Sequence, residues 1–214
     1  MNSNLEAKNT MNHGQYQVLL IEDDPAHERI IARSFEEHKQ YAMLTKSTLY
    51  DARIALTQHT PDLIITDCCL PDGNGIDFLE FISVNRICPT IVMTSFGDEK
   101  LAVKAMKTGA SDYIVKSEQT MTSLPQIANR ILREWQLVLD KQLALDEQNR
   151  LIAIMESSPD LICITDIDGF LTYLNNAGYK MLGLPVDEKL HNIRLADFHT
   201  QNDALLVISE AIPY

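Results

Sequence analysis

Five short runs rich in valine, isoleucine and leucine alternate with helix-like stretches between residues 15 and 122. Nearly continuous apolar strands are typical of a parallel sheet covered by helices on both faces. Five such units in about a hundred residues fit a flavodoxin-like, doubly wound α/β domain with a five-stranded parallel sheet. The expected strands are residues 17–21, 42–46, 62–66, 90–93 and 112–115. Of the expected helices, the first begins near Pro25, the second and third cover 49–58 and 76–84, and the fourth begins at Asp98 and ends at Gly109, a left-handed cap.

A long helical stretch follows at residues 123–155, where no glycine occurs and the last proline is Pro125. Ser123 and Gln126 have the spacing of a capping box. The stretch is either one amphipathic helix that packs on its own domain or a dimerising coiled coil. Its length, about twice that of a usual helix, favours the coiled coil and a homodimer. One heptad register places Ala128, Trp135, Gln142 and Asn149 at a, and Ile131, Val138, Leu145 and Ile152 at d.

A third segment begins at residue 156 and has a different pattern. Apolar runs at 161–165 and 170–174 flank the sequence Asp166-Ile-Asp-Gly169, which predicts a β-hairpin. A short helix is expected at 176–182. Two strands and one helix do not close a sheet around a core, so residues 156–214 are expected to be part of a truncated α+β domain. Residues 1–14 are polar and are expected to form a flexible tail.

The composition narrows the possible partners. The chain has 30 acidic and 18 basic residues, a net charge of −12, which disfavours direct binding to nucleic acid or to anionic membranes. No apolar run approaches the roughly 20 residues needed to span a bilayer. The cysteines, Cys68, Cys69, Cys88 and Cys163, show no regular spacing, so reduced thiols in a cytoplasmic protein are expected.

Charged and hydroxyl side chains directly follow the ends of four predicted strands. Glu22 and Asp23 follow the first strand, Asp67 the third, Thr94 the fourth and Lys116 the fifth. These strand ends meet at one edge of an open α/β sheet, where such sheets bind ligands. Carboxylates there suit Mg²⁺, and a lysine and a threonine add donors for phosphoryl oxygens. Each residue alone is more often a cap or turn residue, but together they predict an aspartate that accepts a phosphoryl group.

Five stretches carry this pattern: residues 18–25, 62–67, 70–75, 91–94 and 109–116. Together they closely resemble the receiver domain of two-component response regulators, over residues 15–122. The resemblance implies that Asp67 is the phosphoacceptor, and it leaves the role of Asp24 open. It also implies a Mg²⁺ site formed by Glu22, Asp23, Asp67 and the Cys69 carbonyl, and switch or phosphate contacts from Thr94, Tyr113 and Lys116.

Two positions depart from the pattern of this family. Ser117 follows the lysine where the family usually has a proline, often after a cis bond. A cis bond before a residue other than proline costs about 3 kcal/mol, so a trans bond and a less rigidly placed Lys116 are expected. Ser95 follows the threonine where a smaller alanine is common, which can alter access to the phosphoryl group.

Residues 150–214 resemble the beginning of a PAS sensory domain, through the hairpin around Asp166 and the following Asn175-Asn-Ala sequence. Three further strands of that family are absent from this segment, and Cys163 does not match the flavin-linking cysteine of light sensors, so no PAS cofactor is assigned. Asp166 also fits the nucleophile motif of haloacid-dehalogenase-type phosphatases. That alternative needs a threonine motif and a lysine motif further along the chain, and this segment lacks both.

The expected function is phosphorylation-controlled signalling. A histidine kinase or a histidine phosphotransfer protein is expected to phosphorylate Asp67, and the change is expected to reach the PAS segment through a dimeric helix. The receiver would itself catalyse phosphoryl transfer and slow hydrolysis, and this segment has no kinase motif. The alternatives are the regulatory segment of a larger hybrid histidine kinase or cyclic-dinucleotide enzyme, and a stand-alone interaction module.

Overall fold

The computed structural model describes residues 14–85, 88–95, 97, 99–186 and 188–198. The predicted tail up to residue 13, the predicted helix start at Asp98 and residues 199–214 of the third segment lie outside these ranges. The chain forms two compact units, Met1–Leu139 and Asp140–Tyr214. Within the described ranges, no helix combines the length and apolar character needed to cross a bilayer.

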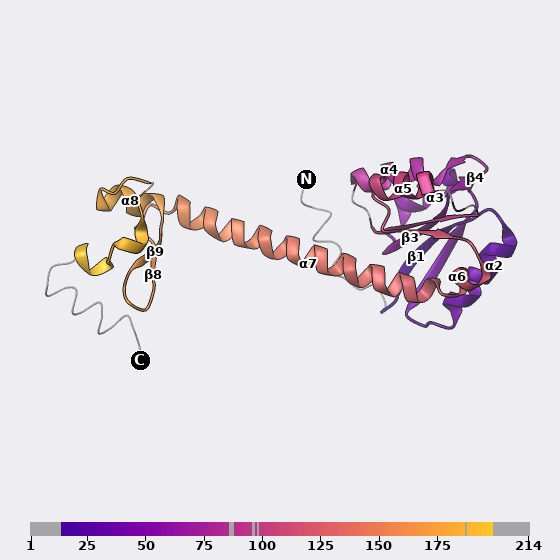
Figure 1. Ribbon diagram of the computed structural model, residues 1–214, viewed down its shortest axis with the longest axis horizontal. Coiled ribbons are helices and arrows are strands. Elements are labelled where there is room, and N and C mark those ends of the chain that lie inside the picture. Colours follow the sequence, from indigo (N-terminus) through magenta and orange to yellow (C-terminus); the bar gives the residue numbers. More distant parts are fainter. Residues whose placement is uncertain (1–13, 86–87, 96, 98, 187, 199–214) are drawn as a thin grey trace. The chain divides into compact units, whose positions relative to one another are not determined.

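A five-stranded parallel sheet forms the centre of the N-terminal unit, as the sequence predicts. Its strand order is β2-β1-β3-β6-β7, with every neighbouring pair parallel. Helices cover both faces of the sheet, with α3, α4 and α5 on one side and α2 and α6 on the other (Figure 1). The strands are β1 (Tyr16–Ile21), β2 (Tyr41–Lys46), β3 (Leu63–Asp67), β6 (Thr90–Thr94) and β7 (Asp112–Val115).

The alternation of side chains along the strands explains why these runs are apolar throughout. In β1, Val18 and Leu20 pack into one core cluster, and Leu19 and Ile21 pack into another. All four are almost completely buried, because helices cover both faces. The helices are α2 (Pro25–Glu36), α3 (Leu49–Gln58), α4 (Gly75–Asn85), α5 (Glu99–Thr108) and α6 (Glu118–Thr122), and a small antiparallel pair, β4 (Cys69–Leu70) and β5 (Gly73–Asn74), lies between β3 and α4.

The helix boundary after β7 differs from the prediction. A capping box forms at Ser117, whose hydroxyl accepts from the Thr120 amide at 3.1 Å, and it begins α6. The predicted box at Ser123 and Gln126 is wrong, because the Gln126 amide donates to the main-chain carbonyl of Ser123 at 3.1 Å and the Ser123 amide donates to the Gln119 carbonyl at 3.2 Å. The Ser123 hydroxyl donates to the Thr120 carbonyl at 3.1 Å. All described peptide bonds are trans, as expected for the bond before Ser117.

The long helix α7 (Leu124–Ser157) begins inside the core of the N-terminal unit. Leu124, Ala128, Ile131 and Leu132 are buried in the same cluster as Val18 of β1. Ile131, assigned by the heptad register to a dimer seam, is therefore corrected: it is 2% exposed and packs on its own domain. The beginning of α7 is therefore a domain helix, and the coiled-coil interpretation stays a prediction for the residues that follow.

The C-terminal unit contains the predicted hairpin. The strands β8 (Cys163–Thr165) and β9 (Leu171–Leu174) pair antiparallel, and helix α8 (Asn176–Leu182) follows. The Asp166 carboxylate accepts from the amides of Asp168 and Phe170 at 3.0 and 2.9 Å, and Gly169 has a φ of 83°. These contacts make Asp166 the residue that closes the turn. Two short 3₁₀ helices, η2 (Leu190–Asn192) and η3 (Leu195–Phe198), complete the described part.

Two polar side chains tie the end of α7 to this unit. Asn175 is fully buried and donates to the carbonyls of Met155 and Asp160, at 3.0 and 2.9 Å. Its carbonyl oxygen accepts from two amides, those of Ile162 and Gly178, both at 2.9 Å. In the last turn of α7, Glu156 accepts from the Tyr173 hydroxyl at 2.7 Å and from the Asn176 amide at 2.9 Å.

Candidate functional site

The strand register brings most of the predicted site residues to one edge of the sheet. Ile21 of β1 pairs with Thr66 of β3, so Glu22 and Asp67 lie side by side one residue further on. Asp67 pairs in turn with Met93 of β6, next to Thr94. Thr94 pairs with Val115 of β7, and the Lys116 amide donates to the Thr94 carbonyl at 2.7 Å. The carboxyl ends of four strands therefore meet at this edge.

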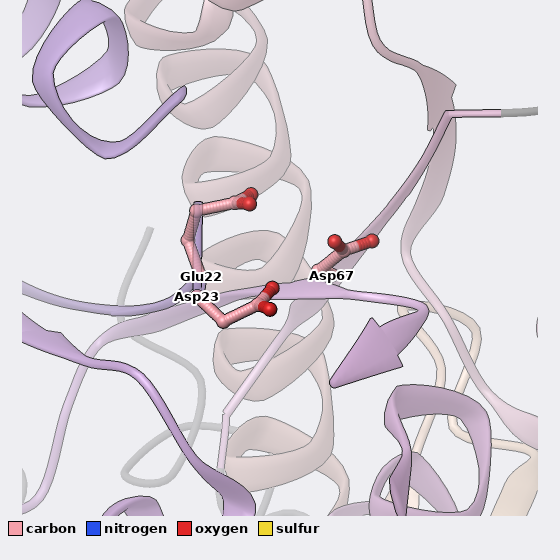
Figure 2. Close-up of side chains that lie close together, drawn as sticks. All are labelled: Glu22, Asp23 and Asp67. Carbon is pink, nitrogen blue, oxygen red and sulfur yellow. The ribbon is translucent and has the colours of Figure 1, made fainter. Parts of the chain in front are cut away.

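Three carboxylates gather at the ends of β1 and β3 (Figure 2). Glu22, Asp23 and Asp67 each offer an oxygen, and these oxygens lie within 4.8 Å of one another. Glu22 and Asp67 are only 2% and 6% exposed, whereas Asp23 is exposed to solvent. Unit charges about 4 Å apart repel by about 4 kcal/mol at an effective dielectric of about 20, so this group requires positive charge close by.

Lys116 supplies part of that charge from the end of β7. Its ammonium donates to Asp67 Oδ2 at 2.6 Å and to Glu22 Oε1 at 2.9 Å. Glu22 Oε2 lies 2.7 Å from the same nitrogen as an ion pair without hydrogen-bond geometry. The Lys116 side chain is only 3% exposed, so this cation is held inside the site.

Burial and neighbouring charges have opposite effects on the pKa values of Glu22 and Lys116. Burial raises the pKa of the Glu22 carboxyl, and the hydrogen bond and charge of Lys116 offset this only in part. Burial lowers the pKa of the Lys116 ammonium, but the hydrogen bonds to Asp67 and Glu22 and the negative charges of both carboxylates together outweigh burial and leave that pKa raised. The ammonium therefore stays charged at neutral pH.

The donor set fits Mg²⁺. Carboxylate oxygens are the ligands that this hard cation prefers, and it keeps several waters, so a site open on one side suits it. Asp23 provides the solvent-exposed side and Glu22 the buried side of this group. Cys69, whose carbonyl the resemblance adds as a ligand, is exposed, and its amide donates weakly to Asp67 Oδ1 at 3.4 Å.

Thr94 lies on β6, the strand next to that of Asp67, and Tyr113 lies on β7, one strand further along the sheet. Thr94 is the last residue of β6 and is 3% exposed. Tyr113 is half-buried in β7 and packs against the cluster that contains Val92 and Ala105. Thr94 thus directly follows Met93, the partner of Asp67 in the sheet, whereas Tyr113 pairs with Val92. The switch roles of Thr94 and Tyr113 stay predictions.

The loop after Asp67 depends on Gly75. The sequence pattern placed this glycine in the motif of residues 70–75 but gave it no role. The Gly75 amide donates to the Cys68 carbonyl at 2.9 Å, which folds the loop back onto the end of β3. A Cβ atom at Gly75 would collide with the Asp67 carbonyl oxygen. The missing side chain therefore permits this close approach.

The structure also assigns a local role to Asp24 and reveals His27, which the sequence analysis missed. Asp24 caps α2 by accepting from the Ala26 amide at 2.7 Å, and this hydrogen bond lowers the pKa of the Asp24 carboxyl. His27 Nδ1 lies 3.4 Å from both Lys116 Nζ and Glu22 Oε1, and 3.5 Å from Asp24 Oδ2. Only its position in the sequence could have indicated that His27 lies near the site, since it falls in the first turn of the helix after the acidic run.

The predicted seam residues of α7 become more exposed beyond the part of the helix that is buried in the receiver core. Trp135 is half-buried, whereas Val138, Leu145 and Ile152 are 61%, 43% and 42% exposed. Apolar side chains at heptad spacing thus remain without cover in the single chain. Dimerisation through them stays a prediction.

Family models match both halves of the chain. The response regulator receiver domain matches residues 18–129, and a PAS domain matches residues 149–212. The second match covers the Asp166 turn, so this segment resembles a PAS domain rather than a phosphatase.

Individual relatives match the N-terminal half. The methanogenesis regulatory protein FilR1 of Methanothrix harundinacea (strain 6Ac) is 37% identical over 127 residues, which are 57% of this chain and 28% of FilR1. The phosphate regulon transcriptional regulatory protein PhoB of Escherichia coli (strain K12) is 31% identical over 47% of this chain and 44% of PhoB. Hybrid signal transduction histidine kinase D of Dictyostelium discoideum is 29% identical over 55% of this chain and 8% of the kinase. The chain thus spans less than half the length of each of these relatives.

A solved structure gives the same result. The signal receiver domain of a proposed Luxo repressor protein from Vibrio parahaemolyticus superposes with a TM-score of 0.52 and 28% sequence identity. The match covers 57% of this chain and 94% of that domain.

Proposed function

The chain belongs to the response regulator receiver domain family and carries a PAS domain after its receiver, and on this premise we propose that Asp67 accepts a phosphoryl group. The donor is a sensor histidine kinase or a histidine phosphotransfer protein. The observation that carries this proposal is the buried contact of Asp67 with Lys116, at 2.6 Å, beside the carboxylates of Glu22 and Asp23. One nucleophile, one held cation and a set of metal ligands are then present at one sheet edge.

The chemistry is a transfer of the phosphoryl group between two protein side chains. A carboxylate oxygen of Asp67 attacks phosphorus, the bond from phosphorus to the donor's imidazole nitrogen breaks, and that nitrogen takes a proton from solvent. The product is an aspartyl phosphate. Lys116 turns its ammonium from the free carboxylate to the phosphoryl oxygens, and the Thr94 hydroxyl donates to one of them.

Glu22, Asp23, Asp67 and the Cys69 carbonyl are the residues that would hold Mg²⁺. The bound ion supplies the positive charge that offsets the repulsion between the carboxylates and the phosphoryl group. Glu22 is buried and fixed by Lys116, so the protein presents this part of the ligand set preformed. Asp23 is exposed, where it is accessible to an ion arriving from solvent.

The output side of the proposal is a dimer formed through α7. The seam comprises Trp135, Val138, Leu145 and Ile152, with polar Gln142 and Asn149 at two a positions to fix the register. A complete switch from 1:99 to 99:1 needs about 5.5 kcal/mol of differential stabilisation, and new phosphoryl contacts from Thr94 and Lys116 are its source. Because the beginning of α7 belongs to the receiver core, a shift of that core moves the helix directly.

A second candidate is that the chain is the regulatory segment of a larger hybrid histidine kinase or cyclic-dinucleotide enzyme in the cytoplasm. The match to a hybrid histidine kinase, of which this chain spans 8%, favours this candidate. The reading frame around this segment distinguishes it from a stand-alone module, because only the larger enzyme would encode a catalytic domain.

Acetyl phosphate with Mg²⁺ tests the proposal, with intact-mass spectrometry as the readout. Wild-type protein is expected to gain the mass of one phosphoryl group, and Asp67→Asn none. Asp166→Asn is the matched control and is expected to behave as wild type, because its carboxylate closes a turn in the other unit. An equal gain in the Asp67 variant, or loss of the gain in the Asp166 variant, would refute the proposal.

A further inference from the structure

His27 contacts the candidate site without belonging to its predicted machinery. Its Nδ1 atom lies 3.4 Å from Lys116 Nζ and 3.4 Å from Glu22 Oε1. The side chain of His27 is 29% exposed, whereas those of Lys116 and Glu22 are 3% and 0% exposed. The imidazole is thus a part-exposed group in direct contact with a fully buried ion pair.

The position of this imidazole is set by the start of α2. Asp24 caps the helix and Pro25 occupies its first turn, which fixes the backbone just before His27. Asp24 Oδ2 also lies 3.5 Å from His27 Nδ1, one helical turn away. The backbone that carries the ring is therefore set by α2 rather than by the strands that lead to Asp67 and Lys116.

A fixed contact of this kind matters because lysine has a long, flexible side chain. In the free receiver, Asp67 and Glu22 share the Lys116 ammonium. During phosphoryl transfer, Asp67 becomes an acyl phosphate, a mixed anhydride, and no longer offers the same carboxylate. Glu22 and His27 are then the remaining contacts of the ammonium.

We infer that His27 is a positioning residue, which holds the Lys116 ammonium and the Glu22 carboxylate in the arrangement that phosphoryl transfer at Asp67 requires. The inference rests on the proposed function, since it assigns His27 to the same site. His27 acts through its neighbours and does not itself exchange a bond with phosphorus.

The test compares His27→Ala with His27→Asn and His59→Ala. Asparagine keeps a polar atom close to the position of Nδ1, so it is the conservative variant. His59 is exposed at the end of α3 and is the matched histidine control. Circular dichroism and thermal unfolding verify that each variant is folded, which is expected because His27 is partly exposed and lies on the first turn of its helix.

The first readout is the rate of phosphorylation by acetyl phosphate with Mg²⁺. His27→Ala is expected to slow it about two- to tenfold, the range for loss of one hydrogen-bonding contact, and His27→Asn to restore most of the rate. His59→Ala is expected to match wild type. A wild-type rate in the alanine variant would overturn the inference while leaving phosphorylation of Asp67 intact.

The second readout does not depend on phosphorylation. Buried, ion-paired ammonium groups exchange protons slowly, so the Lys116 ammonium is expected to give a ¹H–¹⁵N resonance, identified by its loss in Lys116→Arg. His27→Ala is expected to shift or broaden this resonance, and His27→Asn and His59→Ala to preserve it. An unchanged resonance in His27→Ala would overturn the positioning role, even if the rate falls. Failure of wild-type protein to accept any phosphoryl group would refute the proposed function instead.

Discussion

Helix α7 is expected to respond to mutation in two different ways along its length. Ile131 is 2% exposed in the receiver core, and truncating a buried isoleucine to alanine costs about 3 kcal/mol. In a unit of this size, that loss lowers the melting temperature by roughly 9 °C. Val138 is 61% exposed in the single chain, so Val138→Ala changes the free energy of unfolding by less than about 0.5 kcal/mol.

Two measurements separate these effects. Urea unfolding at low protein concentration, followed by fluorescence of the single tryptophan, Trp135, measures stability. Sedimentation measures association, which Val138→Ala is expected to weaken at least tenfold and Ile131→Ala to leave unchanged while the protein is folded. If Ile131→Ala preserves the unfolding midpoint but weakens association, Ile131 belongs to an intermolecular seam and the placement of α7 in the core is wrong.

Three further changes probe local features. Gly75→Ala places a methyl group against the Asp67 carbonyl and is expected to cost roughly 1–3 kcal/mol in urea unfolding and to slow phosphorylation by acetyl phosphate. Asp72 accepts from the amides of Leu49 and Tyr50, which lowers the pKa of its carboxyl. The stability advantage of wild type over Asp72→Ala is therefore expected at pH 7 and should shrink as the pH falls below the ordinary value of 3.8, as thermal unfolding across pH would report. Asn175→Ala removes the hydrogen bonds of this side chain with the amides of Ile162 and Gly178 and the carbonyls of Met155 and Asp160, and is expected to destabilise the C-terminal unit by about 3 kcal/mol, seen as faster hydrogen exchange in β8 and α8.

The sheet was predictable because its signal is local. Runs such as residues 18–21 and 63–65 are apolar at every position, which is the pattern of strands buried on both faces. The order of the strands along the chain, together with the rule that ligands bind at the carboxyl edge of the sheet, was enough to predict that Glu22, Asp67 and Lys116 lie close together. The distances among them confirm that placement.

Capping and burial along the last helices were harder to predict. Ser117 and Ser123 both precede helical sequence, and only the backbone path after β7 decides which hydroxyl reaches an unpaired amide. The heptad pattern has the same difficulty. An apolar residue such as Ile131 satisfies it equally well against its own sheet or against a second chain, since periodicity reports which face is buried and not what covers it.

His27 and Gly75 show where sequence reasoning ends. His27 and Lys116 are 89 positions apart, and their contact joins the first turn of α2 to the residue that follows β7. Gly75 stands in a recognisable loop, but the collision that excludes a side chain is visible only once the loop lies on Asp67. Contacts between distant segments carry no local pattern, so the structure is needed to find them.

Chemical trapping of the acyl phosphate tests the central claim most directly. Wild-type protein would be incubated with acetyl phosphate and Mg²⁺, treated with borohydride, which reduces an aspartyl phosphate to homoserine, and then digested for peptide mass spectrometry. The account predicts homoserine at position 67 and an unchanged residue at every other aspartate. Homoserine at a different position, or none after complete digestion, would contradict it.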